Sequence, residues 1–305
     1  MGCQLGTLED RVILITGAGG AMGRAYAAEL VGHGARLALV QVEPTRTETI
    51  EGVRSASELA DEIDPGSGGH RTIGIALDTG HWAGAQEAID RTAAAFGTVH
   101  GVINAARTAA RDRLIMRTDE SDWAEMIRVQ LTGTMAMMHH AARLWDTESR
   151  AGVRNRRTIV NTVSTSGLLG NAGQASAGAA TAGVGALTNI AAQEFGRLGT
   201  KVNAVCALAR DEVNAQEHGF VQMAQPTSGS DDPWDPRHTA AVVAYLSQPY
   251  QPFTGSSFWA HGREVRRFRG GAMSEPLGRS LNWDLDSLNQ AMRGLLEDGE
   301  EALDG

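Results

Sequence analysis

The sequence predicts an α/β fold built on a doubly wound parallel sheet. Short runs rich in β-branched residues and leucine alternate with longer segments of helical periodicity, which is the pattern of repeated strand–helix units. A glycine-rich stretch separates the first strand run from the first helix run. The length of 305 residues and the apolar content of 42% suit one large domain with a substantial core.

The first part of the chain supplies alternating strands and helices. The run RVILITG is apolar and bounded by glycine, and the helical pattern that follows it stops at Gly34. The turn DPGSGG ends the next helical pattern, because proline and glycine interrupt regular structure. The expected strands are 11–17, 36–42, 71–78 and 98–104, and the expected helices are 21–34, 50–63 and 81–96.

The second part continues the alternation and then becomes less regular. A polar, turn-rich stretch at 225–236 interrupts it. The expected strands are 156–163, 200–207 and, as the last one, 256–262, and the expected helices are 119–145, 174–196 and 237–248. Helices that connect successive strands make the sheet parallel and cover both of its faces.

The end of the chain is amphipathic and acidic. Its apolar residues recur at helical spacing at Leu285, Leu288, Met292, Leu295 and Leu296. A helix with one apolar face docks on its own domain or on a partner, and the alternative is a disordered acidic tail. We therefore expect a single α/β domain, 1–265, followed by a tail with an amphipathic helix, 266–305.

Composition and charge exclude several classes of function. The formal net charge of −9 gives no electrostatic footprint for nucleic acid or for an anionic membrane surface. No apolar run approaches the length of a membrane-spanning helix. The two cysteines suggest neither a disulfide framework nor a metal site, and the N-terminus lacks a signal-peptide pattern. We expect a cytoplasmic protein that binds no metal and no nucleic acid.

The stretch TGAGGAMGRA, residues 16–25, predicts a phosphate-binding loop. Glycines at such a point let the backbone turn tightly and approach a pyrophosphate, which then lies at the N-terminus of the following helix. Gly17, Gly19 and Gly23 are placed to make this approach. The position of the loop, between a strand and a helix at the start of a doubly wound domain, strengthens the prediction.

From residue 8 to about residue 265 these features resemble the short-chain dehydrogenase/reductase family. The family's loop reads T-G-x-x-x-G-x-G; Thr16, Gly17 and Gly23 match it, and Ala21 does not. The resemblance implies a Rossmann-like fold and NAD or NADP as the cofactor, at a site eroded by the loss of several usual residues. Beside the loop glycines, it implies cofactor contacts at Met22, Gln41, Asp78 and Asn104.

The resemblance also implies where the chemistry would take place. The family uses a Tyr, a Lys four residues later, a Ser and an Asn around the reacting carbonyl. Ser164 matches the Ser, whereas Ala177 and Thr181 replace the Tyr and Lys, and Gln130 replaces the Asn. Ala carries no proton and Thr no charge, so acid–base catalysis is lost at these positions. The single lysine, Lys201, has no Tyr four residues before it, so the pair has no displaced copy.

Three functions remain open. Stretches such as GRAYA and RDRLIMRTDESDWAEMI resemble the dehydrogenase module of multifunctional β-oxidation enzymes, a subgroup that acts on hydroxyacyl thioesters and hydroxysteroids. The favoured hypothesis is a non-catalytic subunit that forms a hetero-oligomer with an intact paralogue. The alternatives are a non-redox enzyme, such as a lyase, isomerase or cyclase, and an NAD(P)-dependent oxidoreductase with a substitute acid. A homo-oligomer also remains open.

Overall fold

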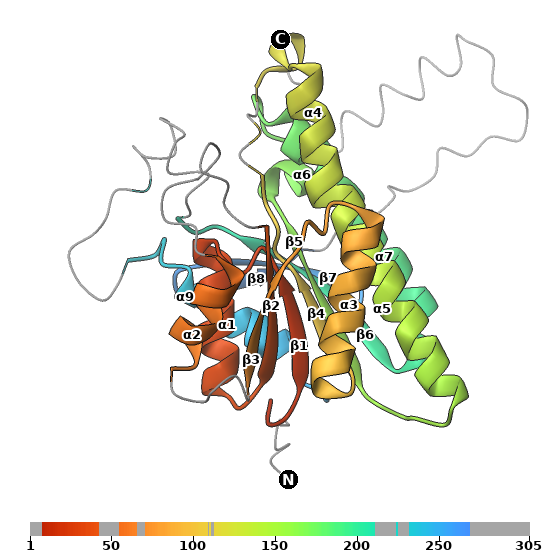
Figure 1. Cartoon of the computed structure of the whole chain (residues 1–305). Helices are drawn as coiled ribbons and strands as arrows, with labels where there is room; N and C mark the ends of the chain where they lie inside the picture. Colours follow the sequence, from red (N-terminus) through yellow and green to blue (C-terminus); the bar gives the residue numbers. More distant parts are fainter. Residues whose placement is uncertain are drawn as a thin grey trace, which may run out of the picture. The chain divides into compact units, whose positions relative to one another are not determined.

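A single sheet organises the computed structural model, which describes residues 8–42, 55–65, 71–108, 110, 113–210, 224 and 232–268. Within these residues eight strands follow the order β3-β2-β1-β4-β5-β6-β7-β8 (Figure 1). The strands from β3 to β7 are parallel, and β8 is antiparallel to β7. The strand order reverses at β1, which confirms the doubly wound α/β fold.

The parallel strands are short and mostly apolar because helices cover them on both sides. In β1 all five residues, VILIT, are buried, as expected for a strand at the centre of such a sheet. The strands are β1 Val12–Thr16, β2 Arg36–Gln41, β3 Thr72–Ala76, β4 Gly101–Asn104, β5 Arg157–Val163, β6 Thr200–Ala207 and β7 Ser256–His261.

Helices form a layer on each face of the sheet (Figure 1). One layer contains α1 Ala21–Gly32, α2 Ala56–Ile63 and α9 Arg237–Leu246, and the other contains α3 Trp82–Phe96, α5 Gly133–Arg150 and α7 Ala175–Glu194. Two large clusters of buried apolar side chains fill the spaces between the layers. The short helices α4, Glu120–Met126, and α6, Thr165–Leu169, lie near the N-terminal part of α7.

One expectation gains a detail and another is wrong. The helix expected at 119–145 is present as one helical stretch, formed by α4, a π-helical turn at Ile127–Thr132, and α5. The strand expected to be last is followed by β8, Glu264–Arg267, which pairs with β7. Every residue of β8 is exposed, so backbone pairing holds the strand in place and no burial pattern marks it.

The described part of the chain ends at Phe268, which also closes a compact unit. The amphipathic helix expected in the tail lies beyond this residue and outside the described residues. Within the described ranges, no helix is both long enough and apolar enough to cross a bilayer. The same ranges contain no cluster of His, Cys, Asp and Glu that could hold a metal ion.

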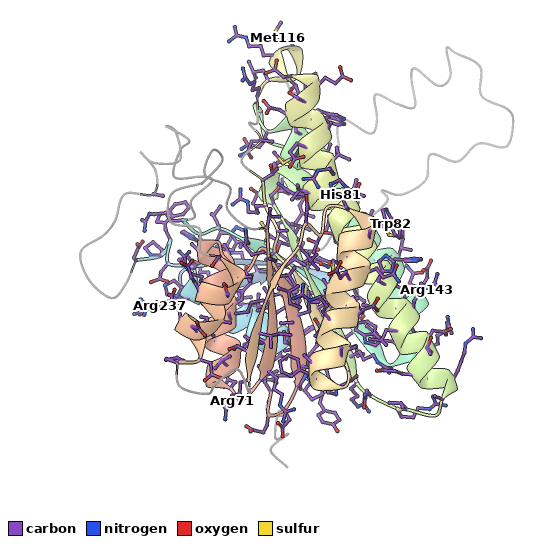
Figure 2. The ribbon with its side chains drawn as sticks, viewed as in Figure 1. Arg71, His81, Trp82, Met116, Arg143 and Arg237 are labelled. Atoms are coloured by element: carbon purple, nitrogen blue, oxygen red, sulfur yellow. The ribbon has the colours of Figure 1, made fainter. Side chains whose placement is uncertain are left out.

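An aromatic cluster joins α3 to α5. The ring of Trp82, labelled in Figure 2, lies 4.9 Å from the ring of His139 and 5.6 Å from the ring of His140 between centroids. Burial, and then the neighbouring His139, lowers the pKa of His140. His140 is therefore neutral at pH 7, and the adjacent histidines serve helix packing.

At the N-terminal ends of the strands, His100 is a half-buried group that is sensitive to pH. The backbone N–H of Val12 donates to His100 Nδ1 at 3.0 Å. Burial, followed by the charge of Arg11, lowers the pKa of His100 to about 4. In the unfolded chain histidine titrates near about 6.5, so that state takes up the proton first as pH falls. The contribution of His100 to stability is therefore complete above about pH 6.5 and decreases down to about pH 4.

The variant His100→Asn should remove part of this pH dependence. The Asn side-chain oxygen can still accept from Val12 N, but it does not titrate. Between about pH 7 and pH 4.5 we expect the unfolding free energy of the wild type to fall by about 1–2 kcal/mol more than that of the variant, a value reduced for the partial exposure of the ring. Urea unfolding at both pH values measures the difference, and parallel pH profiles would contradict the assignment.

Candidate functional site

The loop between β1 and α1 is shaped by two glycines that have no room for a side chain. Gly17 has a φ of +63°, and a Cβ on it would lie 2.5 Å from the Cα of Ala106. A Cβ on Gly23 would lie 2.4 Å from the carbonyl oxygen of Gly17. Both contacts are with backbone, so no side-chain rotation relieves them. The loop thus has the tight turn and close helix packing that a pyrophosphate site requires.

Gln41, at the end of β2, is bound to this loop. Its Oε1 accepts from the backbone N–H of Gly19 at 3.1 Å. Because a backbone N–H can only donate, the amide oxygen faces Gly19 and the Nε2 group is left to face elsewhere. Arg24 Nη1 donates to the carbonyl oxygen of Gly19 at 2.7 Å. Both polar backbone groups of Gly19 are therefore held by side chains.

Asp78, which follows β3, is paired with an arginine from the π-helical turn. Arg128 Nη1 donates to Asp78 Oδ2 at 2.8 Å, and the backbone N–H of Gly80 donates to Asp78 Oδ1 at 2.8 Å. The hydrogen bond to Glu125, together with the attraction of Asp78, raises the pKa of Arg128. Sequence reasoning missed Arg128 because it stands 50 residues from Asp78, and no spacing rule links residues that far apart.

These residues border a cavity of about 600 Å³, the loop cavity, whose lining includes Gly17, Gln41, Asp78, Arg107 and Arg128. Its size falls within the range of small-molecule sites. The loop cavity lies at the carboxyl ends of β1, β2 and β3, beside the point where the strand order reverses. In doubly wound sheets, ligands bind in the crevice at this point.

A second cavity, of about 150 Å³, brings together the four positions that the sequence singles out for chemistry. We name it the hydroxyl cavity. Ser164 lies at the end of β5, Ala177 and Thr181 lie on α7, and Gln130 lies on the π-helical turn. Met22 and Asn104 also line it.

The described wall of the hydroxyl cavity carries no group suited to acid–base work near neutral pH. Its ionisable residues, among those that the structure describes, are Arg107 and Cys206. Arg107 is exposed, and a guanidinium can only donate hydrogen bonds. Burial raises the pKa of the Cys206 thiol to about 12, so this thiol stays protonated.

The hydroxyl groups of this wall form a chain with a fixed direction. Thr181 Oγ1 lies 2.6 Å from the carbonyl oxygen of Ala177, which can only accept, so the Thr181 proton points there. Ser164 Oγ lies 2.8 Å from Thr181 Oγ1 and must therefore donate to it. Ser164 Oγ in turn accepts from the hydroxyl of Ser166 and from the backbone N–H of Gly167. Ser164 thus has no proton left for a ligand.

This chain depends on close contact between α6 and α7. A Cβ on Gly167 would lie 2.3 Å from Thr181 Oγ1 and 2.6 Å from the backbone nitrogen of Ala182. Glycine at this position lets the first turn of α6 lie directly on α7. Ser164, the N-cap of α6, is thereby brought to the Thr181 hydroxyl.

Gln130 faces the hydroxyl cavity from the π-helical turn and is bound within its own helix. Its Nε2 donates to Met126 Sδ at 2.8 Å, and its backbone carbonyl oxygen accepts from Thr134 Oγ1 at 2.7 Å. Single π-helical turns inside helices occur frequently at functional sites. Gln130 therefore contributes to the wall, while its amide hydrogen bond is made to the neighbouring helical turn.

A second chain of hydrogen bonds fixes the orientation of the Asn104 side-chain amide. Thr188 Oγ1 donates to the carbonyl oxygen of Val184 at 2.8 Å, so it accepts from Asn161 Nδ2, which lies 2.9 Å away. Asn161 Oδ1 then accepts from Asn104 Nδ2 at 2.8 Å. Asn104 is 4% exposed, and its Oδ1 has no hydrogen-bond partner among the described residues.

The sequence pattern that defines the short chain dehydrogenase family matches residues 11–216. The hydroxyacyl-CoA dehydrogenase ChsB1 of Mycobacterium tuberculosis is 29% identical over 94% of this chain and 88% of its own length. The (2S)-[(R)-hydroxy(phenyl)methyl]succinyl-CoA dehydrogenase subunit BbsD of Thauera aromatica is 29% identical over 78% of this chain and 90% of its own.

Solved structures agree with these relatives. A short chain dehydrogenase from Mycobacterium avium is 29% identical and superposes with a TM-score of 0.84 over 98% of each chain. The match of the family model extends over more than half of the chain, and the strand order and the glycine loop are those of a doubly wound fold. The chain therefore belongs to the short-chain dehydrogenase family, and within it resembles dehydrogenases of hydroxyacyl thioesters.

Proposed function

We propose that this chain is a catalytically degenerate short-chain dehydrogenase homologue that serves as the non-catalytic subunit of a heteromeric oxidoreductase. One observation carries the proposal. Ala177 and Thr181 line the hydroxyl cavity at the positions of the family's Tyr and Lys, and no described lining residue replaces them. The intact paralogue would perform the reaction on a hydroxyacyl thioester or a related compound, the substrate class named for ChsB1.

The chemistry explains why these two losses matter most. Oxidation of a hydroxyl group delivers a hydride to the cofactor and a proton to a base within hydrogen-bond reach. Ser164 cannot take that proton, because Ser166 and Gly167 occupy its lone pairs and its own proton goes to Thr181. Loss of a positioned acid or base typically slows such a step by about 10²–10⁴-fold.

The cofactor site fits a dinucleotide only in part. Gly17 and Gly23 give the loop the tight turn and close helix packing of a pyrophosphate-binding loop, and the loop cavity is large enough for an adenosine group. NAD or NADP would supply the hydride acceptor, but the hydroxyl cavity offers no described group for the accompanying proton. The residues that would hold the dinucleotide are Gly17, Gly19, Met22, Gly23, Gln41, Asp78 and Asn104.

The outer surface of α5 and α7 supports association with another chain. A groove of about 740 Å³ runs between these helices, and apolar side chains such as Met138, Leu187 and Ile190 line much of it. Small exposed residues of α7 would let a partner's helix approach closely. They are Ala179, Ala182 and Ala186. One relative, BbsD, is by its name a subunit. We expect a cytoplasmic hetero-oligomer.

Assays of the separate and combined chains test the proposal. Purified alone, this protein should oxidise a panel of 3-hydroxyacyl-CoA esters, with NAD or NADP, at no more than about one hundredth of the rate of the complex with its paralogue. Co-expression followed by size-exclusion chromatography shows whether that complex forms.

Each other outcome points to a different function. NAD(P)-linked turnover by the protein alone would favour an oxidoreductase with a substitute acid. Turnover without a cofactor would favour a non-redox enzyme. A stable homo-oligomer that ignores the paralogue would remove the partner from the proposal.

A further inference from the structure

We infer that residues 284–298 of this chain form an amphipathic helix that binds in a groove between α9 and β8. We name this groove the α9 groove. It lies in the helix layer of α1 and α9, whereas α5 and α7 belong to the other layer (Figure 1). The inference concerns neither of the cavities described above, and it goes beyond the proposed function without depending on it.

The α9 groove has a volume of about 790 Å³ and an aromatic floor. Phe253 lies 6.3 Å from Tyr245 and 5.1 Å from Phe258 between ring centroids. Val242 of α9 and Val265 of β8 also line the groove, and Val265 is 54% exposed. Helices cover both faces of a doubly wound sheet, so an apolar surface that the described residues leave exposed at its edge is a seat for a further helix.

The register of β8 directs an apolar and a basic side chain to this side of the sheet. Val265 pairs with Ala260, and Arg267 pairs with Phe258. Side chains of paired residues share one face of a sheet. Ala260 and Phe258 belong to the core cluster that also contains buried side chains of α9, so the shared face is that of α9. The guanidinium carbon of Arg267 lies 5.8 Å from the ring centroid of Phe253.

The rim of the α9 groove has an excess of positive charge. Arg237 and Arg263 line it, and Arg267 lies over its floor. Among its described lining residues, Asp235 is the one carboxylate, and it pairs with Arg237 at 2.7 Å. Complementary charge across an interface selects among partners. The groove therefore favours an acidic amphipathic helix over a basic one.

The sequence that follows β8 supplies a segment of this kind. Residues 284–298 contain four acidic residues and one arginine. The described chain ends at Phe268, whose backbone N–H donates to the carbonyl oxygen of Ser257 in β7 at 2.8 Å. The intervening residues, 269–283, reach about 50 Å when extended, which is ample for a groove whose lining includes β8.

The apolar face of this segment matches the groove in length. Its apolar residues recur at helical spacing and span about 16 Å along a helix. They are Leu285, Leu288, Met292, Leu295 and Leu296. The helix α9 has ten residues, which corresponds to about 15 Å. The segment can thus lie along α9 with its apolar face in the groove, which is the helix-in-groove mode of recognition.

A helix bound in the α9 groove would affect how the protein associates. It would cover an apolar surface that could otherwise bind another chain. The surface of α5 and α7, in the other helix layer, would remain open to a partner. The segment would in this way direct association to one face of the sheet.

Chemical cross-linking of the full-length protein tests the contact. Ala241→Cys places a thiol at the groove, because Ala241 is exposed on α9 and lines the groove. Asn289→Cys places a second thiol beside the apolar face of the segment. Both are made in a Cys3→Ser background. Cys206 is buried, and its pKa is raised to about 12, so its thiol stays unreactive.

A short bismaleimide should link Ala241→Cys to Asn289→Cys within one chain. Ala179→Cys with Asn289→Cys is the matched control, because Ala179 is an exposed alanine of α7 in the other layer. We expect the groove pair to react at least about five-fold faster, since docking raises the effective concentration of the two thiols. Denaturing electrophoresis separates linked single chains from linked dimers, and mass spectrometry of tryptic peptides identifies the linked residues.

Substitutions in the segment and at the rim test the chemistry of the contact. Leu288→Asp should slow the intrachain reaction at least about five-fold, because it removes an apolar anchor. Ser287→Asp adds the same charge one residue earlier, away from the apolar face, and should leave the rate within about two-fold of the parent. Arg263→Glu with Arg267→Glu should slow the reaction about two- to five-fold at low ionic strength.

Three results would overturn the inference. The first is equal reaction of the groove pair and the Ala179→Cys control. The second is a cross-link that forms only between chains, which would assign the groove to a second copy. The third is equal behaviour of Leu288→Asp and Ser287→Asp. These measurements need neither a dinucleotide nor a substrate, so their outcome is independent of the proposed function.

Discussion

The double variant Ala177→Tyr and Thr181→Lys should oxidise 3-hydroxyacyl-CoA with NAD or NADP at least about 100-fold faster than the wild-type chain. Positions 177 and 181 lie four residues apart on α7 and both line the hydroxyl cavity, so the new side chains would share one helix face. The Tyr would supply a hydroxyl for acid–base work. The Lys would supply a positive charge that lowers the pKa of this hydroxyl toward the working pH.

The two substitutions should depend on each other. Thr181→Lys adds the charge and also removes the acceptor that holds the Ser164 proton, so Ser164 is released toward the substrate oxygen. Ala177→Tyr alone leaves that proton on Thr181 and introduces a phenol whose pKa stays near about 10. Each single variant should therefore gain less than about 10-fold, and the double variant should exceed the product of the two.

A control of similar volume separates chemistry from packing. Ala177→Phe with Thr181→Met fills the same space without an acid or a cation. Initial rates followed by the absorbance of the reduced nicotinamide compare the four variants with the wild type. An equal gain in the Phe/Met control would show that packing causes the effect. A folded Tyr/Lys variant that binds the dinucleotide but remains at the wild-type rate would contradict the assignment of positions 177 and 181.

Much of the fold can be predicted from the sequence because the parallel strands are buried on both faces. A strand such as β1, VILIT, is then visible as an apolar run. The strand β8 and the π-helical turn cannot be predicted in this way. The residues EVRR of β8 are all exposed, so their pattern resembles a loop. The π-helical turn at Ile127–Thr132 differs from an α-helix in its backbone hydrogen bonds, and the spacing of side chains does not reveal this.

The site is predictable where it depends on sequence spacing and unpredictable where it depends on contacts. The absence of a Tyr and a Lys at positions 177 and 181 follows from the sequence, and so does the absence of a displaced pair. The hydrogen bonds that occupy the Ser164 hydroxyl do not follow from the sequence. They require Gly167 to let α6 lie on α7, and they require the Ala177 carbonyl to orient the Thr181 proton. The pairing of Arg128 with Asp78 likewise needs the folded chain.

Arg157 makes several strong contacts that stabilise the fold. Arg157 begins β5, and its side chain is 1% exposed. Its Nη2 donates to Glu148 Oε2 at 2.6 Å, and its Nη1 donates to the carbonyl oxygen of Leu198 at 2.9 Å. The guanidinium carbon also lies 5.8 Å from the ring centroid of Trp145. One side chain thus joins α5, β5 and the segment before β6. This contact lies where β5 begins, whereas the loop between β1 and α1 lies where β1 ends.

Arg157→Ala should therefore lower the free energy of unfolding by about 3–5 kcal/mol. Most of the loss arises because the Glu148 carboxylate, only 16% exposed, is left without its counter-charge. Arg150→Ala is a matched control, because Arg150 pairs with Asp146 at 2.8 Å but is 80% exposed, and it should change stability by less than about 1 kcal/mol. Urea unfolding measures both variants. Arg157→Met with Glu148→Gln should recover part of the loss, since it removes the uncompensated charge; a double variant as unstable as Arg157→Ala would show that lost packing and hydrogen bonds, rather than the buried carboxylate, set the effect.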